Sequence, residues 1–274
     1  MKIIIDQECI FTSPNAVKFR PAGELGGDLV SITLNTDGTQ LRIAPVLSEE
    51  NLAIYAANIC NQINNIKIPC GSTVEYAGVS DTPFISLAAY ELKKRGIQLE
   101  EIEFWHNYRD VESELQGWNI MSHAPASNKS NPVLHHHPEK LSCLHRNGDC
   151  IITFSSSFPV SKDNLSGINT RGCDVFEFDV RCPGVDSILS KTTALIFAQE
   201  IKERILSIQA QNSNCVKRIH LVMSTSVSMT FCLAYMLIEP YMPRISIYHY
   251  DAHTKNKRSW GIDFSGGDYA VFIK

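Results

Sequence analysis

The sequence lacks the long apolar segments that a membrane span or a secretion signal needs. Its longest apolar run, Phe231 to Ile238, is far below the roughly 20 residues required to cross a bilayer, and the run after Met1 is too short for a signal peptide. Closely spaced pairs of cysteines are also lacking. The nine cysteines are an odd number and are scattered along the chain. These absences argue against a disulfide framework and predict a protein of the reducing cytoplasm.

Positive charge is not in excess either. The net charge of −4 argues against binding to polymeric nucleic acid, which depends on broad neutralisation of phosphates, but it is compatible with a small anionic ligand in a local pocket. Lys255, Lys257 and Arg258 form either a local basic patch for such a ligand or a solvated loop. The content of 44% hydrophobic and 20% charged residues is typical of a soluble globular protein.

The common catalytic and metal-binding motifs are missing. There is no G-x-S-x-G sequence and no Walker loop, and the glycine-rich segment Gly23 to Gly27 precedes an expected strand, which excludes a dinucleotide fingerprint. His135 to His137, Cys143, His145 and Cys150 lie close in sequence, but their spacing matches no common zinc site, so solvated histidines are the favoured interpretation. We therefore expect no catalytic residue, no metal and no cofactor.

One supersecondary unit occurs twice in the chain. Each copy has an apolar strand, a polar turn, a helical stretch and a second strand that ends in aromatic and polar residues. The first copy comprises Val74–Gly78, Val79–Thr82, Pro83–Arg95 and Ile102–His106, and the second comprises Ile219–Met223, Ser224–Val227, Ser228–Ile238 and Ile245–His249. The alternative interpretation is a chance similarity between two ordinary α/β stretches.

The repeat predicts an α/β fold of two fused Rossmann-like units, related by a pseudo-twofold axis, with mainly parallel sheets. An upstream strand and helix precede each copy, the helices being Ser48 to Asn64 and about Asp186 to Gln209. We expect the first unit at residues 1–120, a linker or long loop at 121–147, and the second unit at 148–274.

The two polar turns are the main candidate ligand sites. In an open parallel sheet, ligands bind beyond the carboxyl ends of the strands, where helix N-termini present free N–H groups to anions. The alternative is that the serines and threonines only cap helices. Aromatic and polar side chains at the second strand ends are suited to stack on bases and read their edges, although Trp105 could equally be a core residue. The candidate ligand-binding residues are Gly78, Ser80, Asp81, Thr82, Trp105, His106, Asn107, Tyr108, Arg109, Ser224, Thr225, Ser226, His249, Tyr250, Asp251, Lys255, Lys257 and Arg258.

The C-terminal part of the chain resembles a SAVED domain. The resemblance rests on His220 to Ser224, the helical pair Leu233-Ala234 with its small alanine, the strand Arg244 to Asp251, and the closing segment Trp260 to Phe264. SAVED domains resemble two fused CARF-type Rossmann units, in agreement with the internal repeat. This chain departs from the family at Met223 to Ser226, where Ala, Gly or Pro is common, which puts the ligand contacts of that turn in doubt.

The resemblance implies a non-enzymatic sensor of a cyclic oligonucleotide second messenger in anti-phage immunity, either CBASS or type III CRISPR. Because the sensor accounts for the whole sequence, we expect signalling through a separate effector protein or through self-association on ligand binding. The alternatives are a ring nuclease that cleaves the messenger, an unrelated hydrolase, and a purely protein-binding module. Ring size, base and linkage are not specified by the sequence.

Overall fold

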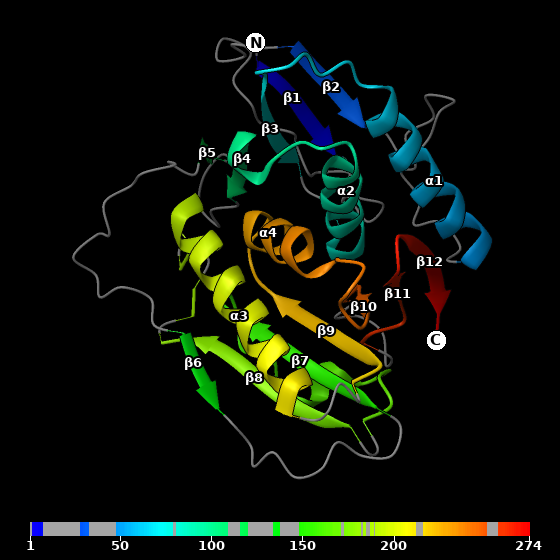
Figure 1. Cartoon of the computed structure of the whole chain (residues 1–274), viewed down its shortest axis with the longest axis vertical. Coiled ribbons are helices and arrows are strands. Elements are labelled where there is room, and N and C mark those ends of the chain that lie inside the picture. The colour runs from blue at the N-terminus through cyan, green and yellow to red at the C-terminus, as the bar shows by residue number, and fades with distance from the viewer. Residues whose placement is uncertain are drawn as a thin grey trace.

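The computed structural model describes residues 2–7, 28–32, 48–78, 81–108, 116–119, 134–137, 148–170, 173–181, 183–184, 187–188, 190–211, 216–250 and 257–274. These residues form two β-sheets with helices between and beside them (Figure 1). The predicted mixed α/β fold with mainly parallel sheets is confirmed, because the interior strands of both sheets run parallel and the antiparallel pairs involve β5, β6, β11 and β12 near the sheet edges. The pseudo-twofold relation stays a prediction.

The first sheet has the strand order β2-β1-β3-β4-β5. Its strands are β1 (Lys2–Gln7), β2 (Asp28–Ile32), β3 (Thr73–Gly78), β4 (Ile102–Tyr108) and β5 (Gln116–Asn119). The second sheet has the order β12-β11-β10-β9-β7-β8-β6. Its strands are β6 (Leu134–His137), β7 (Asp149–Ser155), β8 (Asp174–Val180), β9 (Arg218–Ser224), β10 (Arg244–Tyr248), β11 (Trp260–Ser265) and β12 (Asp268–Ile273). Strand β6 lies within the segment 121–147 that we expected as a linker, and the division into units stays a prediction.

Local signals explain where the helices begin and end. Helix α1 (Glu49–Asn65) starts after Ser48, whose Oγ accepts the Asn51 N–H at 3.1 Å. Helix α2 (Thr82–Lys94) has a proline in its first turn and is followed by Gly96 with φ of 79°. Helix α3 (Lys191–Gln211) begins later than the predicted Asp186, because the Ser190 Oγ accepts the Thr193 N–H at 3.1 Å and starts the helix there.

Helices α2 and α4 (Val227–Leu237) pack against each other between the two sheets (Figure 1). Phe231 of α4 is fully buried, and its ring lies 5.0 Å from Tyr76 of β3 and 5.3 Å from Phe104 of β4. The rings of Phe84 in α2 and Trp260 in β11 also pack together, with their centroids 5.2 Å apart. The two halves of the chain therefore share one hydrophobic core, which fixes the carboxyl edges of their sheets relative to each other.

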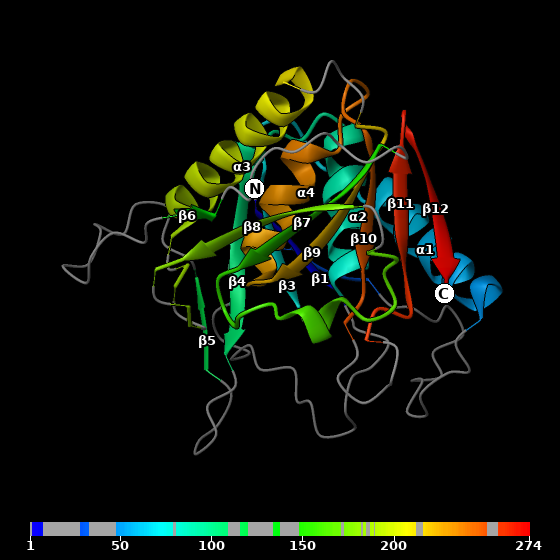
Figure 2. The same cartoon turned by 90° about the horizontal axis from the view of Figure 1, so that it is seen from below.

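The outer face of the second sheet carries a smaller core. Leu165 and Ile168, in and just after the short helix η2 (Lys162–Leu165), cover Ile151, Val222 and Tyr248. Figure 2 shows α3 and the β11–β12 hairpin on opposite sides of the molecule. A second short helix, η1 (Leu99–Glu101), leads into β4.

Candidate functional site

Asp81 connects the end of β3 to the start of α2. Its backbone oxygen accepts the N–H groups of Phe84 and Ile85, both at 2.9 Å, while its side chain makes no capping hydrogen bond. Gln7, at the end of neighbouring β1, donates from Nε2 to the Phe84 carbonyl oxygen at 3.3 Å. The first turn of α2 is thus held by Asp81 and by Gln7 at the end of β1. The Asp81 side chain is buried and does not cap the helix.

The Asp81 carboxylate meets His249, which follows β10 in the second half of the chain. The distance from His249 Nδ1 to Asp81 Oδ1 is 3.0 Å, and both side chains are largely buried. The imidazole is stacked on Trp260, with centroids 5.0 Å apart and an interplanar angle of 18°, and the His249 N–H donates to the Trp260 carbonyl oxygen. Two predicted site residues, one from each repeat, are therefore in contact.

The turn after β9 is joined to the turn after β7. The N–H groups of Ser156 and Ser157 donate to the Ser224 carbonyl oxygen at 2.9 and 3.0 Å, and the Phe158 N–H donates to Ser224 Oγ at 3.2 Å. The hydroxyl groups of Ser156 and Thr225 lie 2.5 Å apart. Two neighbouring parallel strands thus end in one hydroxyl-rich surface, which we call the serine edge (Ser155–Phe158 and Ser224–Ser226).

Ser226 links the serine edge to helix α4. Its Oγ accepts the N–H of Met229 at 3.4 Å, so it is the N-cap of that helix. The helix-cap interpretation of this serine is therefore correct, but capping does not exclude ligand contact, because the N-terminus of α4 is directed to the same edge. Thr82, by contrast, is the first residue of α2.

Sequence reasoning missed the β7 part of the serine edge. Ser155, Ser156 and Ser157 follow the apolar strand Ile151–Phe154, which is the same local signal that identified the other turns. Phe158 is among the most exposed large apolar side chains in the described part of the chain, at 64%. The signal was visible in the sequence, but only the strand order places this turn beside Ser224.

Arg258, predicted to contact the ligand, is buried with an exposed fraction of 2%. Its guanidinium lies over the Tyr250 ring, with Cζ 4.7 Å from the centroid, and its Nε donates to the Asn164 carbonyl oxygen at 3.0 Å. Burial lowers the pKa of Arg258 to about 10, which leaves it charged at neutral pH. The neighbouring Lys257 donates its backbone N–H to Ser166 Oγ at 3.0 Å.

The remaining predicted site residues are only partly covered by the structure. Gly78 ends β3, and Trp105 to Tyr108 form the end of β4, so their backbones lie at the carboxyl edge of the first sheet. The predicted residues that lie outside the described ranges are Ser80, Arg109, Asp251 and Lys255. Ligand binding by all these residues stays a prediction.

Three of the described cysteines are buried. Burial raises the pKa of Cys60, Cys150 and Cys232 to about 12, so these thiols are protonated at neutral pH. Within the described ranges, no three or more His, Cys, Asp or Glu side chains are grouped so that they could hold a metal ion. In the same ranges, no helix has the length and apolar character of a membrane span.

A second polar cluster lies on the outer face of the second sheet. Lys274 Nζ donates to Tyr248 Oη at 3.0 Å, and this hydroxyl lies 2.6 Å from His220 Nδ1. On the other side of the imidazole, Nε2 lies 3.6 Å from Asp149 Oδ2. Burial and, next, the charge of Lys274 lower the pKa of His220 to about 4, although Asp149 opposes the shift.

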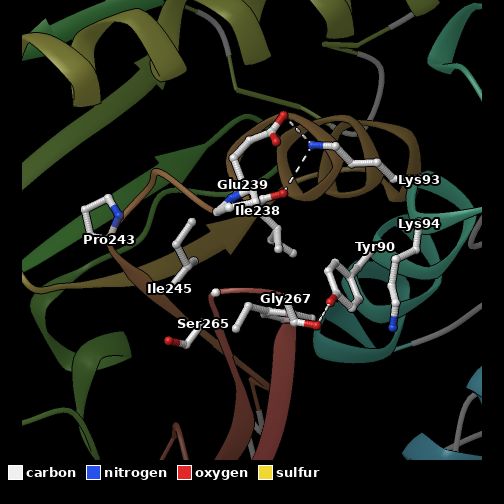
Figure 3. A pocket seen from close by; sticks show the side chains of 12 residues that line it. Tyr90, Lys93, Lys94, Ile238, Glu239, Pro243, Ile245, Ser265 and Gly267 are labelled. Carbon is white, nitrogen blue, oxygen red and sulfur yellow. Dashed lines mark hydrogen bonds and ion pairs between the residues drawn. The ribbon is translucent and has the colours of Figure 1, made fainter. Parts of the chain in front are cut away.

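A pocket of about 230 Å³ lies at the amino end of β10, between α2 and the β11–β12 hairpin (Figure 3). At the edge of the pocket, Lys93 Nζ donates to the Glu239 carboxylate at 2.5 Å and to the Ile238 carbonyl oxygen at 3.1 Å. None of the predicted site residues lines this pocket, and it is smaller than the range of roughly 300–1,000 Å³ typical of ligand sites. We therefore place the candidate site at the opposite, carboxyl edge.

The structure is similar to solved receptors of the SAVED/CARF type. One is the Acinetobacter baumannii Cap4 SAVED/CARF-domain containing receptor with the cyclic trinucleotide 2′3′3′-cAAA, with a TM-score of 0.57 and 13% identity over 100% of this chain and 51% of that chain. The same receptor with 3′3′3′-cAAA gives a TM-score of 0.53 and 14% identity over 98% of this chain and 51% of the other. The chain thus spans about half the length of these receptors, and at this identity the likeness shows the fold.

Among curated proteins, no match to this chain is found. A family match does exist and confirms the predicted resemblance: residues 71–264 match SAVED, described as the "SMODS-associated and fused to various effectors sensor domain". The match includes both polar turns, the Asp81–His249 contact and the serine edge. Because it covers well over half of the sequence, the protein belongs to the SAVED family of sensor domains.

Proposed function

We propose that this protein is a sensor that binds a cyclic oligonucleotide second messenger of anti-phage defence at the carboxyl edges of its two sheets. The observation that carries the proposal is the 3.0 Å contact between Asp81 and His249, because it brings the polar turn of the first repeat to the second strand end of the second repeat. Membership of a sensor family and the fold shared with receptors of cyclic trinucleotides support the ligand class.

The chemistry of this edge suits a phosphodiester ring. The N-termini of α2 and α4 are directed to it, and their dipoles favour phosphate. The partly exposed hydroxyl groups of Ser224 and Thr225 are suited to donate to phosphate or ribose oxygens, and the buried Ser156 hydroxyl contacts that of Thr225. Asp81 and His249 are suited to hydrogen-bond base edges.

Binding across both repeats would link the messenger to assembly. A ligand held by loops of two units favours the conformation in which those units present a complete surface to a partner. We propose that the messenger increases self-association or affinity for a separate effector. Static light scattering with and without messenger, repeated with candidate effector proteins, measures this directly.

The test of function is incubation of the pure protein with a panel of cyclic di-, tri- and tetranucleotides, followed by chromatography of the bound nucleotide. Recovery of an intact ring supports the sensor. Recovery of linear products shows a ring nuclease, and the absence of any bound nucleotide shows a protein-binding module. The panel includes 3′3′3′-cAAA and 2′3′3′-cAAA as probes.

Two matched serine variants test the location of the site. Ser226 caps α4 at the serine edge, and Ser48 caps α1, whose Glu49 side chain accepts the Ile273 N–H at 3.2 Å near the end of β12. Replacing either by Ala should cost about 1 kcal/mol of stability through the lost cap. Only Ser226→Ala should also weaken messenger binding. Equal affinities of the two variants in calorimetry would contradict a site at this edge.

A further inference from the structure

We propose that Tyr250 is a stacking platform for one purine base of the ligand and that the buried Arg258 is the residue that positions it. This inference rests on the proposed function and deepens it, because it names the part of the ligand that is recognised. It also gives Arg258 a supporting role in place of the direct ligand contact that its position in the sequence suggested.

The Tyr250 side chain is partly exposed, and a buried cation lies against its ring. Its exposed fraction is 40%, whereas the Arg258 guanidinium, 4.7 Å from the ring centroid, is 2% exposed. The buried cation therefore covers one side of a ring that is itself partly exposed to solvent. A flat, accessible aromatic surface is the feature on which a nucleobase stacks.

The ring is held from several directions before any ligand arrives. Asn164 Nδ2 donates to Tyr250 Oη at 3.0 Å, and the Asn164 carbonyl oxygen accepts from Arg258 Nε at the same distance. The Arg258 backbone N–H donates to the Ser166 carbonyl oxygen at 3.0 Å. Because these contacts fix the ring against the η2 segment, stacking a base on it costs little side-chain entropy.

Burial of Arg258 has a cost that packing alone does not explain. A buried charge needs hydrogen-bond partners, yet Nη1 of this guanidinium has none among the described residues. Among the described residues, the guanidinium contacts the Asn164 carbonyl oxygen and the face of the Tyr250 ring. Both contacts fix Tyr250 and the segment that orients it, which indicates that the position of this ring is what the buried cation secures.

Tyr250 lies at the same level of the sheet as the serine edge. The pairing of β10 with β9 ends at Ile247 and Leu221, so Tyr250 follows β10 at the same edge of the sheet at which Ser224 ends β9. A ring at this level can receive a base while the serine hydroxyls receive the adjoining phosphate or ribose. Purines present the larger aromatic face, so the platform should favour an adenine-containing ring over a uracil-containing one.

A similar pair elsewhere in the fold provides a control. Tyr241, in the turn between α4 and β10, is 61% exposed, and Lys202 Nζ lies 5.7 Å from its centroid. This turn precedes β10, so it is at the opposite edge of the sheet from the serine edge. Tyr241→Ala removes an exposed tyrosine with a neighbouring cation without touching the proposed platform.

The experiment is calorimetric titration of 3′3′3′-cAAA and 3′3′3′-cUUU into the wild type and the variants Tyr250→Ala, Tyr250→Phe and Tyr241→Ala. Tyr250→Ala should bind cAAA roughly 5- to 140-fold more weakly, because stacking of one base on an aromatic side chain contributes about 1–3 kcal/mol and 1.4 kcal/mol corresponds to tenfold. Tyr250→Phe should retain most of the affinity, and Tyr241→Ala should match the wild type.

The positioning role is tested with Arg258→Met and Arg258→Lys, and with Asn164→Ala, which removes the hydrogen bond to the Tyr250 hydroxyl, in case the Arg258 variants do not fold. Loss of positioning should reduce the ratio of cAAA to cUUU affinity, with partial rescue in Arg258→Lys. A general structural defect would weaken both ligands by the same factor and would overturn this role.

Two failures are distinguishable. If the wild type binds cAAA and Tyr250→Ala binds it equally well, the platform is wrong while the sensor function stands. If the wild type binds no cyclic oligonucleotide of the panel, the proposed function is wrong, and so is the role of Tyr250 as a platform.

Discussion

Acid should destabilise this protein through His220, because the folded state holds this imidazole neutral. Its exposed fraction is 5%, and burial followed by the charge of Lys274 lowers its pKa to about 4 from an ordinary value near 6.5. Between these two values the unfolded chain binds a proton that the folded chain does not. The contribution of His220 to stability is therefore constant above about pH 6.5 and is lost progressively as the pH falls toward 4.

The magnitude follows from the difference between the two pKa values. A shift from about 6.5 to about 4 corresponds to roughly 3 kcal/mol when the loss is complete, at about 1.36 kcal/mol for each pKa unit. Between pH 8 and pH 5 the free energy of unfolding should fall by about 2 kcal/mol because of this group alone. Such a loss is a large fraction of the stability of an ordinary domain.

The assay is urea unfolding between pH 5 and pH 8 for the wild type and for His220→Gln, which cannot titrate in this range. The difference between the two stability curves isolates His220 from the carboxylates that also titrate in acid. It should be flat above pH 7 and should change by about 2 kcal/mol toward pH 5. A parallel pair of curves, or a His220 imidazole resonance that titrates near 6.5, would refute the reasoning.

Two further predictions concern packing. Phe231→Ala should lower the free energy of unfolding by about 3–5 kcal/mol, because this fully buried ring contacts Tyr76 and Phe104 across the junction of the two halves. The control Phe231→Leu should lower it less, and equal thermal unfolding of the two variants would contradict the shared core. Gly261→Ala should lower the free energy of unfolding by about 1–3 kcal/mol, because the added methyl group would overlap the Ile247 carbonyl oxygen. At Gly71 an added methyl group meets open space, so Gly71→Ala should cost only the strain of its positive φ, and denaturant midpoints compare the two variants.

Much of the local structure followed from the sequence, because its signals act over a few residues. The predicted helices Ser48–Asn64 and Pro83–Arg95 agree to within one residue at each end with α1 (Glu49–Asn65) and α2 (Thr82–Lys94). The start of α3 was predicted too early because Ser190, which begins that helix, did not stand out among the polar residues before it.

The candidate site was predicted in part for the same reason. Polar residues that follow an apolar strand mark a carboxyl edge, and this rule located Asp81, Ser224 and His249. It did not reveal that the turn at Ser156 adjoins the turn at Ser224, because the order of β7 and β9 in the sheet depends on long-range pairing. The contact between Asp81 and His249 depends in the same way on the packing of α2 and α4 between the sheets.

The sequence by itself determined the family, the α/β alternation and the polar turns, because these depend on residue type and short-range order. Only the tertiary structure decided which turns meet and which side chains face solvent. Arg258 shows the difference: in the sequence it is a cation near a basic cluster, and in the fold it is buried beneath Tyr250. The physical reason is that burial and strand adjacency are properties of residues far apart in the chain, brought together only when the shared core forms.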